Sequence, residues 1–280
     1  MNRTMITAQN TLTQLQKQMD IVSNNMANID TTGYKRRESN FTDLLFQQYN
    51  NQTIPNLEVN RLTPNGVRQG VGAKLAQSQM VGSQGSIKST DRSLDMALTA
   101  EGQYFKVLEQ SENGSAIRYT RDGAFYLTPL SANENMLVTS NGYPVLDENN
   151  NPITINGDVK EFVLQDGGRL TASLGNGGSS EFNLGVVRVK KSQFLEQKGG
   201  NLLGLPENAG ELNTPIEDIL TELNGPLRNQ ISMQQRALEQ SNVDMSKEMT
   251  ELINMQRAYQ FQSRSISIAD QMMGLVNGIR

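Results

Sequence analysis

The chain has 280 residues, a formal net charge of −4, and no cysteine, histidine or tryptophan. The absence of cysteine and histidine excludes disulfides, thiol nucleophiles, histidine-based catalytic triads and most zinc sites. A mildly acidic chain argues against a dedicated nucleic-acid-binding protein, since such proteins carry a basic face. No run approaches the roughly 18 apolar residues that would predict membrane insertion, and the first residues lack the apolar centre of a cleavable secretion signal.

The first predicted element is a long amphipathic helix that ends near residue 29. Its apolar residues recur at alternating spacings of three and four, which is the heptad seam of a coiled coil. They are Met5, Ala8, Leu12, Leu15, Met19, Val22, Met26 and Ile29. Between residues 2 and 29 only Arg3, Lys17 and Asp20 are charged, and the other polar residues are Asn, Gln, Thr and Ser. Neutral amides suit identical helices packed around an axis, because like charges would repel there. A soluble two-helix hairpin with a polar outer face is the alternative.

The end of this helix predicts a corner in the chain. The side chains of residues 30–32 compete for local hydrogen bonds and stop the helix, and Gly33 then supplies a turn with positive φ. We expect Tyr34 to be a flat contact and residues 35–37 to point outward toward the next segment. The amides expected to project toward neighbouring backbones are those of Asn24, Asn25 and Asn28. The corner is therefore predicted to be an assembly joint between the helix and the domain that follows.

The middle of the chain predicts an antiparallel β domain. Residues 41–52 favour a short helix, and residues 53–72 are broken by Pro and Gly and favour an extended or loop structure. From about residue 73 to 205, short β-like runs are divided by Asn-Gly, Asp-Gly and Gly-Gly steps, which are typical of hairpin turns. Residues 211–224 favour a helix, and residues 226–241 favour an extended return toward the terminal helices.

A second long helix is predicted from about residue 243 to 278. Ser241 or Asn242 is its expected N-cap, and Asp244 lies in the first turn, where the helix dipole favours a carboxylate. The apolar seam again alternates spacings of three and four. It consists of Leu252, Met255, Tyr259, Gln262, Ile266, Ala269, Met273 and Val276, widened by Met245, Met249 and Ile253.

A chain whose first and last segments both offer a seam most simply pairs them. The predicted fold class is therefore α+β, with N- and C-terminal helices paired as a coiled-coil-like stalk and a central antiparallel all-β domain. The expected parts are a helix with its motif, an extended or loop segment, the β domain, a return segment and the last helix. They cover residues 1–35, 36–72, 73–225, 226–242 and 243–280.

Three features resemble chemical sites, but each has a simpler interpretation. Residues 147–152 alternate oxygen ligands as a calcium loop does, yet Pro152 replaces the sharp-turn glycine, so a hairpin turn is favoured. Residues 174–180 are Gly-rich but lack the lysine and the following helix of a phosphate loop, so they also predict a turn. Paired carboxylates can cleave glycosides, but nothing holds two of them together here, and solvated strand charges are favoured. These acidic residues are Glu101, Glu109, Glu112 and Asp122. We expect no catalytic, metal-binding or cofactor-binding residue.

Two long motifs at opposite ends of the chain resemble one family. The stretch VSNNMANIDTTGYKRRESNF, residues 22–41, resembles the N-terminal signature of the flagellar rod and hook axial proteins, S-N-N-x-A-N-x-x-T-x-G-Y-K. It falls on Ser23, Asn24, Asn25, Ala27, Asn28, Thr31, Gly33, Tyr34 and Lys35. Residues 238–273 resemble the C-terminal block of the same family. Its landmarks are Leu238, Glu239, Ser241, Asn242, Val243, Asp244, Glu248, Met249, Gln256, Arg257, Ala258, Tyr259 and Asp270.

The middle of the chain also resembles the rod proteins, and is closest to the distal-rod type of Gram-positive bacteria. The similar stretches are FTDLLFQQ, LTPNGVRQGVG, GSIKSTDRSLDMALTAEGQYF, YTRDGAFYLT, LVTSNGYPVLD and GGNLL. Two departures stand out. Arg236 lies where the family commonly has glycine, and MALTAEGQYF lacks the usual Gly-Asp-Gly or Gly-Asn-Gly step. The family's backbone geometry is therefore not carried over to these two places.

The resemblance implies a structural subunit of the flagellar basal-body rod rather than an enzyme. Such subunits leave the cytoplasm unfolded through the flagellar type III export apparatus, without a cleavable signal, and polymerise helically into a hollow shaft that transmits torque from motor to hook. The implied partners are further copies of the chain, other rod proteins and the hook protein, with no nucleic acid, membrane insertion or cofactor. Proximal rod and hook protein are alternatives within the family. A secreted adhesin and a cell-wall glycan hydrolase are alternatives outside it.

The residues expected at the assembly interface combine the two seams with the two motifs. They are Leu12, Leu15, Met19, Val22, Asn24, Asn25, Met26, Asn28, Ile29, Thr32, Gly33, Tyr34, Lys35, Ser241, Asn242, Val243, Asp244, Met249, Leu252, Gln256, Arg257, Tyr259, Ile266 and Met273.

Overall fold

The structure is a computed structural model, and it divides into two compact units, each built from separate segments of the chain. We name Met1–Met26, Arg37–Ser78 and Met245–Arg280 the helical unit, and Ala27–Arg36 and Gln79–Asp244 the β unit. The described residues are 2–43, 46–49, 67–70, 73–111, 114–131, 133–175, 177–199, 201–206 and 215–278. The predicted combination of two terminal helices with a central region of antiparallel strands is confirmed.

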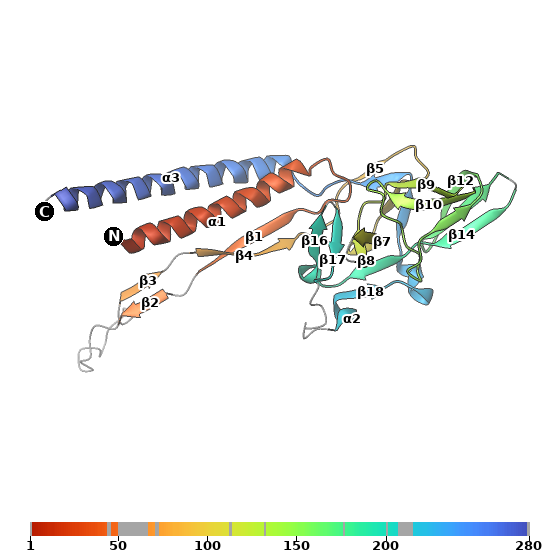
Figure 1. Ribbon diagram of the computed structural model, residues 1–280, viewed down its shortest axis with the longest axis horizontal. Helices are drawn as coiled ribbons and strands as arrows, with labels where there is room; N and C mark the ends of the chain where they lie inside the picture. Colours follow the sequence, from red (N-terminus) through yellow and green to blue (C-terminus); the bar gives the residue numbers. More distant parts are fainter. Residues whose placement is uncertain are drawn as a thin grey trace. The chain divides into compact units, whose positions relative to one another are not determined.

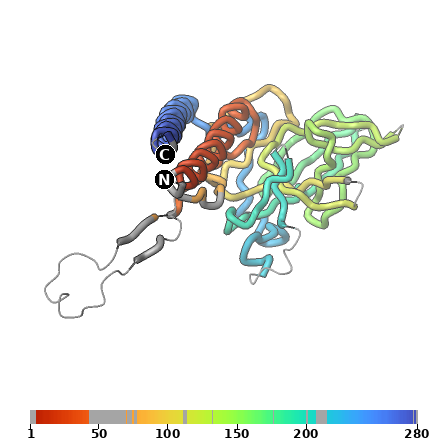
Figure 2. The backbone as a smooth tube through the Cα atoms, turned by 60° about the vertical axis from the view of Figure 1, so that its left-hand side comes forward, coloured from red at the N-terminus to blue at the C-terminus, as the bar shows by residue number. Residues whose placement is uncertain are grey.

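The helical unit contains two long helices, α1 (Asn2–Ala27) and α3 (Met245–Gly278), which lie side by side in Figures 1 and 2. Asn25 Nδ2 donates a hydrogen bond to Glu248 Oε2 at 3.1 Å, and Gln16 Nε2 donates to the Tyr259 hydroxyl at 3.4 Å. The helices are antiparallel, because residue numbers rise along one as they fall along the other. The coiled-coil-like form of this pairing stays a prediction. No helix among the described residues has the length and apolar content to cross a bilayer.

The seam predicted for α1 is buried or half-buried along its whole length. Its buried members are Ala8, Leu15 and Val22. On α3 the predicted seam is buried or half-buried from residue 252 to 273, and Val276 is exposed. The three-and-four spacing of each seam therefore identifies the less exposed face of each helix.

Two short strand pairs follow α1 in the helical unit. Strand β1 (Arg37–Asp43) pairs with β4 (Ala73–Met80), and β2 (Phe46–Tyr49) pairs antiparallel with β3 (Val67–Gly70). The short helix predicted over residues 41–52 is therefore wrong wherever the structure describes it, and residues 44–45 and 50–52 lie outside the described residues. Helix propensity is a weak preference over so few residues, and pairing with a neighbouring strand overrides it. Of the extended segment predicted over 53–72, only the strand β3 lies within the described residues.

Short antiparallel strands build the β unit, as predicted. Its largest sheet has the strand order β16-β17-β8-β7-β15-β18. The bounds of these strands are β7 (Gln103–Ser111), β8 (Gly114–Thr120), β15 (Val186–Val189), β16 (Glu196–Gly199), β17 (Leu202–Gly204) and β18 (Leu220–Glu222). A 3-10 helix, η2 (Ser192–Phe194), precedes β16.

The β unit also contains smaller sheets, and several of their strands are labelled in Figure 1. These sheets are β11-β10-β9, β12-β13-β14, β19-β6 and β20-β5. Their bounds are β5 (Ile87–Ser89), β6 (Met96–Leu98), β9 (Phe125–Ser131), β10 (Glu134–Thr139), β11 (Thr154–Asn156), β12 (Val159–Gln165), β13 (Arg169–Leu174), β14 (Ser179–Asn183), β19 (Met233–Gln235) and β20 (Ala237–Glu239).

The segment before β19 departs from its prediction. Within the described residues 215–224, the helix expected over residues 211–224 is limited to α2 (Ile216–Ile219), because β18 follows at once and pairs with β15. Residues 207–214 lie outside the described residues. The extended return expected over 226–241 begins instead as a 3-10 helix, η4 (Gly225–Gln230), and becomes extended only at β19 and β20.

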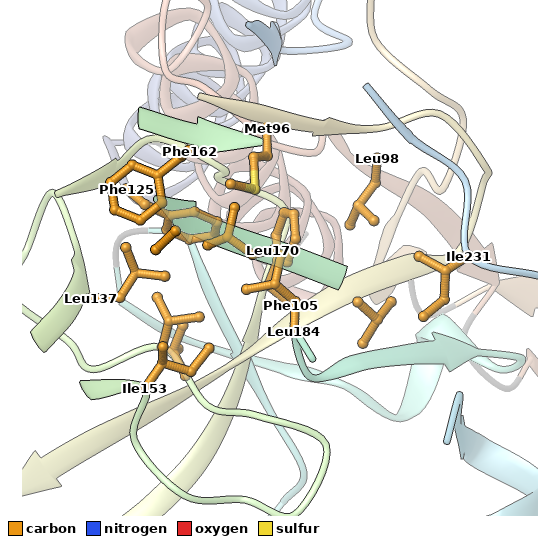
Figure 3. Close-up of a cluster of buried hydrophobic side chains, with 14 of the residues drawn as sticks. Met96, Leu98, Phe105, Phe125, Leu137, Ile153, Phe162, Leu170, Leu184 and Ile231 are labelled. Atoms are coloured by element: carbon orange, nitrogen blue, oxygen red, sulfur yellow. The ribbon is translucent and has the colours of Figure 1, made fainter. Parts of the chain in front are cut away.

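The six-stranded sheet has apolar side chains packed against both of its faces. Figure 3 shows the larger cluster, in which the rings of Phe105 and Phe125 meet edge to face with centroids 5.1 Å apart. The neighbouring residue Tyr104 belongs to a second cluster with Val187. This division is expected, since successive side chains of a strand point to opposite faces. Burial raises the pKa of Tyr104 to about 12, so its hydroxyl stays neutral in ordinary conditions.

The two places where the chain departs from the family pattern both have left-handed backbone. Arg236, between β19 and β20, has φ of +56°, a conformation that an L-residue adopts at a cost of roughly 1–2 kcal/mol. The left-handed geometry therefore exists here without a glycine. In the stretch MALTAEGQYF, Gly102 supplies the turn alone, with φ of +72°.

Candidate assembly joint

Four segments of the β unit meet at the predicted corner. The corner, Ala27–Arg36, lies beside residues 81–86, beside the end of β8, and beside the residues that follow β20. Gly33 N donates to the carbonyl of Glu239 at 2.8 Å, and Val81 N donates to the carbonyl of Arg36 at 2.8 Å. Gln240 N donates to the carbonyl of Ser86 at 2.8 Å. We call this meeting place the joint.

One carboxylate at the centre of the joint binds two cationic side chains. Glu239 is 2% exposed, and its Oε1 accepts hydrogen bonds from Lys35 Nζ at 2.7 Å and from Gly85 N at 2.9 Å. Its Oε2 accepts from Arg121 Nε at 2.5 Å. The side chains of all three charged residues are at most 3% exposed. Charges removed from water to this degree are stable only when they are paired and hydrogen-bonded, so the fold depends on Glu239 here.

The remaining donors of the two cations bind backbone carbonyls. Lys35 Nζ also donates to Ser83 O at 2.8 Å, and Arg121 Nη1 donates to Gln103 O at 2.6 Å. Burial lowers the pKa of Lys35, and the adjacent carboxylate of Glu239 opposes that change. The prediction that residues 35–37 point outward is thus wrong for Lys35 and Arg36, which are both buried. The buried counter-charge that holds Lys35 comes from a residue far along the chain.

The positive φ predicted for Gly33 is confirmed, with φ of +68°. A methyl group at this position would lie 2.5 Å from Asp122 N and 2.6 Å from the carbonyl carbon of Arg121. The adjacent Thr32 donates its hydroxyl to Asp122 Oδ1 at 2.9 Å, and its carbonyl accepts from Asn201 Nδ2 at 2.6 Å. The glycine therefore allows the corner to pack directly on the backbone that follows β8.

Asp122 is buried, so the solvated position predicted for it is wrong. Burial raises the pKa of Asp122, while hydrogen bonds from Ala124 N, Thr32 and Ser140 lower it and only partly offset the burial. Of the other carboxylates weighed with it, Glu101 is exposed, Glu109 is paired with Arg118, and Glu112 lies outside the described residues. Asp122 thus serves as an acceptor in the joint.

We expect Asp122→Asn to change how stability depends on pH. A carboxyl whose folded pKa is raised stabilises the fold most when it is protonated, and this contribution is lost as pH rises from the ordinary value of 3.8 through the raised pKa. Asparagine keeps an Oδ1 acceptor but does not ionise. The free energy of unfolding of the variant, relative to the wild type, should therefore rise as the pH increases above the ordinary value of 3.8, as measured in urea titrations. A constant difference across this range would contradict the assignment.

Asn242 makes further contacts between the segments of the joint. Asn242 Oδ1 accepts from Arg36 N at 2.6 Å, and its Nδ2 donates to the carbonyls of Val81 and Ser83 at 3.0 Å each. Asn242 was an expected N-cap, but α3 begins only at Met245, and the amide binds the joint instead. The nearby Ser241 accepts from Val243 N at 3.3 Å.

Asn25 plays a similar part inside the helical unit. This buried amide accepts from Arg37 N at 3.0 Å and donates to Arg37 O at 2.9 Å, as a neighbouring strand would. Asn25 therefore binds the backbone of its own chain, and its predicted role in assembly stays a prediction. Asn28 Oδ1 accepts from the Thr31 hydroxyl at 3.2 Å, and Asn24 is exposed, so the roles predicted for these two amides also stay predictions.

The other residues predicted for the assembly interface lie on the two helices and beside them. Their role at an interface stays a prediction. Buried or half-buried members are Leu12, Leu15, Met19, Val22, Met26, Ile29, Tyr34, Val243, Leu252, Tyr259, Ile266 and Met273. Exposed members are Asp244, Met249, Gln256 and Arg257. Three further residues of the joint, Arg121, Gly85 and Asn201, were not predicted. Each lies in a stretch that resembles the family, but the sequence of that stretch does not indicate its contact partner.

Residues 147–152, which resemble a calcium loop, form the predicted hairpin turn. Asp147 N donates to Asn151 O at 2.8 Å and closes it. The buried ammonium of Lys106 lies against this turn, donating to Asn150 Oδ1 at 2.6 Å and to Glu148 O at 3.1 Å. An internal cation thus binds two oxygens of this turn. The described residues of 174–180 also connect β13 to β14, where Leu174 N donates to the carbonyl of Gly178 at 2.8 Å.

Comparison with known proteins links the joint to a family. Residues 5–35 match "Flagella basal body rod protein", residues 98–172 match "Flagellar hook protein FlgE/F/G D1 domain", and residues 234–279 match "Flagellar basal body rod FlgEFG protein C-terminal". Each matched segment supplies one member of the buried ionic cluster, namely Lys35, Arg121 and Glu239.

Relatives match over nearly the whole chain. The flagellar hook-basal body complex protein FlhP of Bacillus subtilis is 48% identical over 100% of both chains. The flagellar basal-body rod protein FlgG of Agrobacterium fabrum is 32% identical over 94% of this chain and 93% of its own, and that of Borreliella burgdorferi is 32% identical over 100% and 99%. The chain therefore belongs to the flagellar basal-body rod family, and it is a structural subunit of the rod in the bacterial flagellum.

Proposed function

We propose that this rod subunit polymerises helically with further copies of itself in the distal part of the rod. The polymer is a hollow shaft that transmits torque from the motor to the hook, and its ends contact other rod proteins and the hook protein. The subunit reaches the rod unfolded, through the flagellar type III export apparatus. The resemblance of the middle segments to distal-rod proteins supports the position, and the absence of cysteine suits a chain that crosses compartments unfolded.

The observation that best supports a polymer is a second apolar seam on α3, beside the first. It consists of Ala258, Phe261, Ser265, Ile268, Met272 and Leu275, again at spacings of three and four. Each member of this seam directly precedes a member of the first seam, and one position is about 100° around the helix. Phe261 is 72% exposed and Leu275 is 70% exposed. An exposed apolar stripe of this length is typical of a surface that another chain covers.

The charges of the helices favour a copy of the same chain as that partner. Between residues 252 and 278 of α3 only Arg257, Arg264 and Asp270 are charged, and α1 is similarly poor in charge. Copies can therefore approach without strong repulsion between like charges. Full burial of a Phe, Leu, Ile or Met side chain contributes about 1.5–3 kcal/mol, so four of them supply a substantial part of a subunit contact.

Phe261→Asp tests this proposal. We expect the substitution to raise the concentration needed for polymerisation by about 30-fold or more, because it removes a buried ring and places a charge in the seam. Sedimentation and electron microscopy of purified protein would measure polymer, and circular dichroism would verify that the monomer is folded.

Ser263→Asp is the matched control. It adds the same charge to the same helix at an exposed site outside both seams, and polymerisation should stay near the wild-type level. Equal loss in both variants would contradict the second seam as the contact.

The rod position has its own test. A tagged copy located near the hook end of purified basal bodies would support the distal rod, and one near the motor would contradict it.

A further inference from the structure

The last residues of the β unit bind the rest of it through polar side chains, in addition to strand pairing and apolar contacts. We name residues 231–243 the clasp. Gln235 Nε2 donates to the carbonyls of Ser93 and Phe162 at 2.7 Å each, and its Oε1 accepts from Leu164 N at 3.1 Å. Glu239 and Asn242 make the contacts described for the joint. Polar contacts of this kind are strong only when both surfaces are already in place, since a half-made set leaves buried groups without partners.

Two strands of the β unit obtain their strand pairing from the clasp. In the described sheets, β5 pairs only with β20, and β6 pairs only with β19. The three residues of β6 are at most 1% exposed and supply two side chains, Met96 and Leu98, to the larger core cluster. If the clasp left, buried backbone groups of β6 would lose their hydrogen bonds, which is costly away from water.

The clasp also holds the corner of the chain. It supplies the carboxylate of Glu239 for Lys35, the carbonyl of Glu239 for Gly33 N, and the amide of Asn242 for Arg36 N. Without the clasp, the buried cations Lys35 and Arg121 would lack a counter-charge. Breaking a buried pair in this way is far more destabilising than losing an exposed one.

We propose that the clasp opens and closes as one cooperative unit, and that its closure seats the corner Ala27–Arg36. The chain then secures its N-terminal corner only when residues 231–243 dock. The corner directly follows α1 and the clasp directly precedes α3, so a single event orders both segments of the β unit that adjoin the terminal helices in the chain. This inference concerns one subunit, and it holds whether or not copies polymerise as proposed above.

Gly85 provides a direct way to test the clasp. Its N–H donates to Glu239, and an added methyl group would collide with the carbonyl oxygen of Gln240 in the clasp. Gly82, three residues earlier in the same segment, has nothing within 4 Å of that methyl position. Gly85→Ala should therefore disturb the clasp, and Gly82→Ala is the matched control.

The measurement is native-state hydrogen exchange of the full-length protein, read by mass spectrometry. In the wild type, amides of residues 33–36 and 237–242 should exchange through one shared opening with one denaturant dependence, at a lower free energy than the amides of residues 105–107. In Gly85→Ala both sets should exchange faster together, by on the order of 100-fold, with the core less affected. Gly82→Ala should leave all rates at the wild-type level.

Three results would overturn the proposal. One is a corner that keeps its exchange rate while the clasp exchanges faster, and another is an equal effect of the two alanines. The third is a wild-type protein in which corner, clasp and core share one opening. If Gly85→Ala fails to fold, the wild-type profile alone still decides between a separate clasp and a single global unit.

Discussion

Glu239→Gln is expected to lower the free energy of unfolding by about 3–5 kcal/mol. Glutamine has the shape of glutamate, so packing is retained, but the negative charge is lost. Lys35 and Arg121 then remain buried near each other with no counter-charge. In addition, the amide nitrogen of glutamine cannot accept the hydrogen bond that Arg121 Nε now donates to Glu239 Oε2. Urea unfolding followed by circular dichroism and tyrosine fluorescence would measure the loss.

Glu109→Gln is the control for this substitution. Glu109 forms a comparable ion pair with Arg118, with Oε2 and Nε 2.6 Å apart, but the two side chains are 21% and 16% exposed. Water screens such a pair, so its loss should cost at most about 1 kcal/mol. Equal losses in the two variants would mean that burial does not decide the contribution of Glu239, and the account of the joint would fail.

The elements that could be predicted from sequence are those encoded by local patterns. Both long helices follow from apolar spacings of three and four, which require nothing beyond the segment itself. The hairpins of the β domain follow from Asn-Gly, Asp-Gly and Gly-Gly steps for the same reason, as does the positive φ of Gly33. The short helix predicted over residues 41–52 is wrong where the structure describes it, because β1 and β2 form there instead. These strands depend on pairing with β4 and β3, which lie later in the chain.

The joint could be located from sequence, but its chemistry could not. Lys35 in the stretch GYKRR looks like a solvated charge, because the carboxylate that neutralises it is 204 residues away. Asp122 in RDG looks like a turn residue for the same reason, since Thr32 lies 90 residues earlier. One sequence without its fold contains no signal that joins these positions. The family matches supply part of this missing signal, because the three matched segments are those that meet at Glu239.

The joint also explains why the N-terminal motif begins with amides and ends in charged residues. Lys35 and Arg36 are buried in the β unit, whereas Asn25 is buried in the helical unit. The motif thus changes its chemistry where the chain passes from one unit to the other. Amides serve the poorly charged helices, and ions serve the joint, where Glu239 provides a specific partner.

Gly33→Ala is the second substitution expected to have a large effect, a loss of about 3 kcal/mol or more in the free energy of unfolding. Left-handed backbone costs an L-residue roughly 1–2 kcal/mol. The added methyl group would also lie 2.5 Å from Asp122 N and 2.6 Å from the carbonyl carbon of Arg121, and backbone atoms cannot move aside as a flexible side chain can. The corner must therefore shift, which weakens the bonds that Thr32 and Lys35 make.

Gly142→Ala separates the two causes of this loss. Gly142 has φ of +83°, but nothing lies within 4 Å of its methyl position, so alanine there meets the backbone cost without the collision. Its expected loss is about 1–2 kcal/mol, reduced by the smaller entropy of the unfolded chain. The excess loss in Gly33→Ala then measures how tightly the corner packs on the end of β8. Equal losses in the two alanine variants would show that the corner can move away from Asp122 at no cost, and would contradict its close packing on the residues that follow β8.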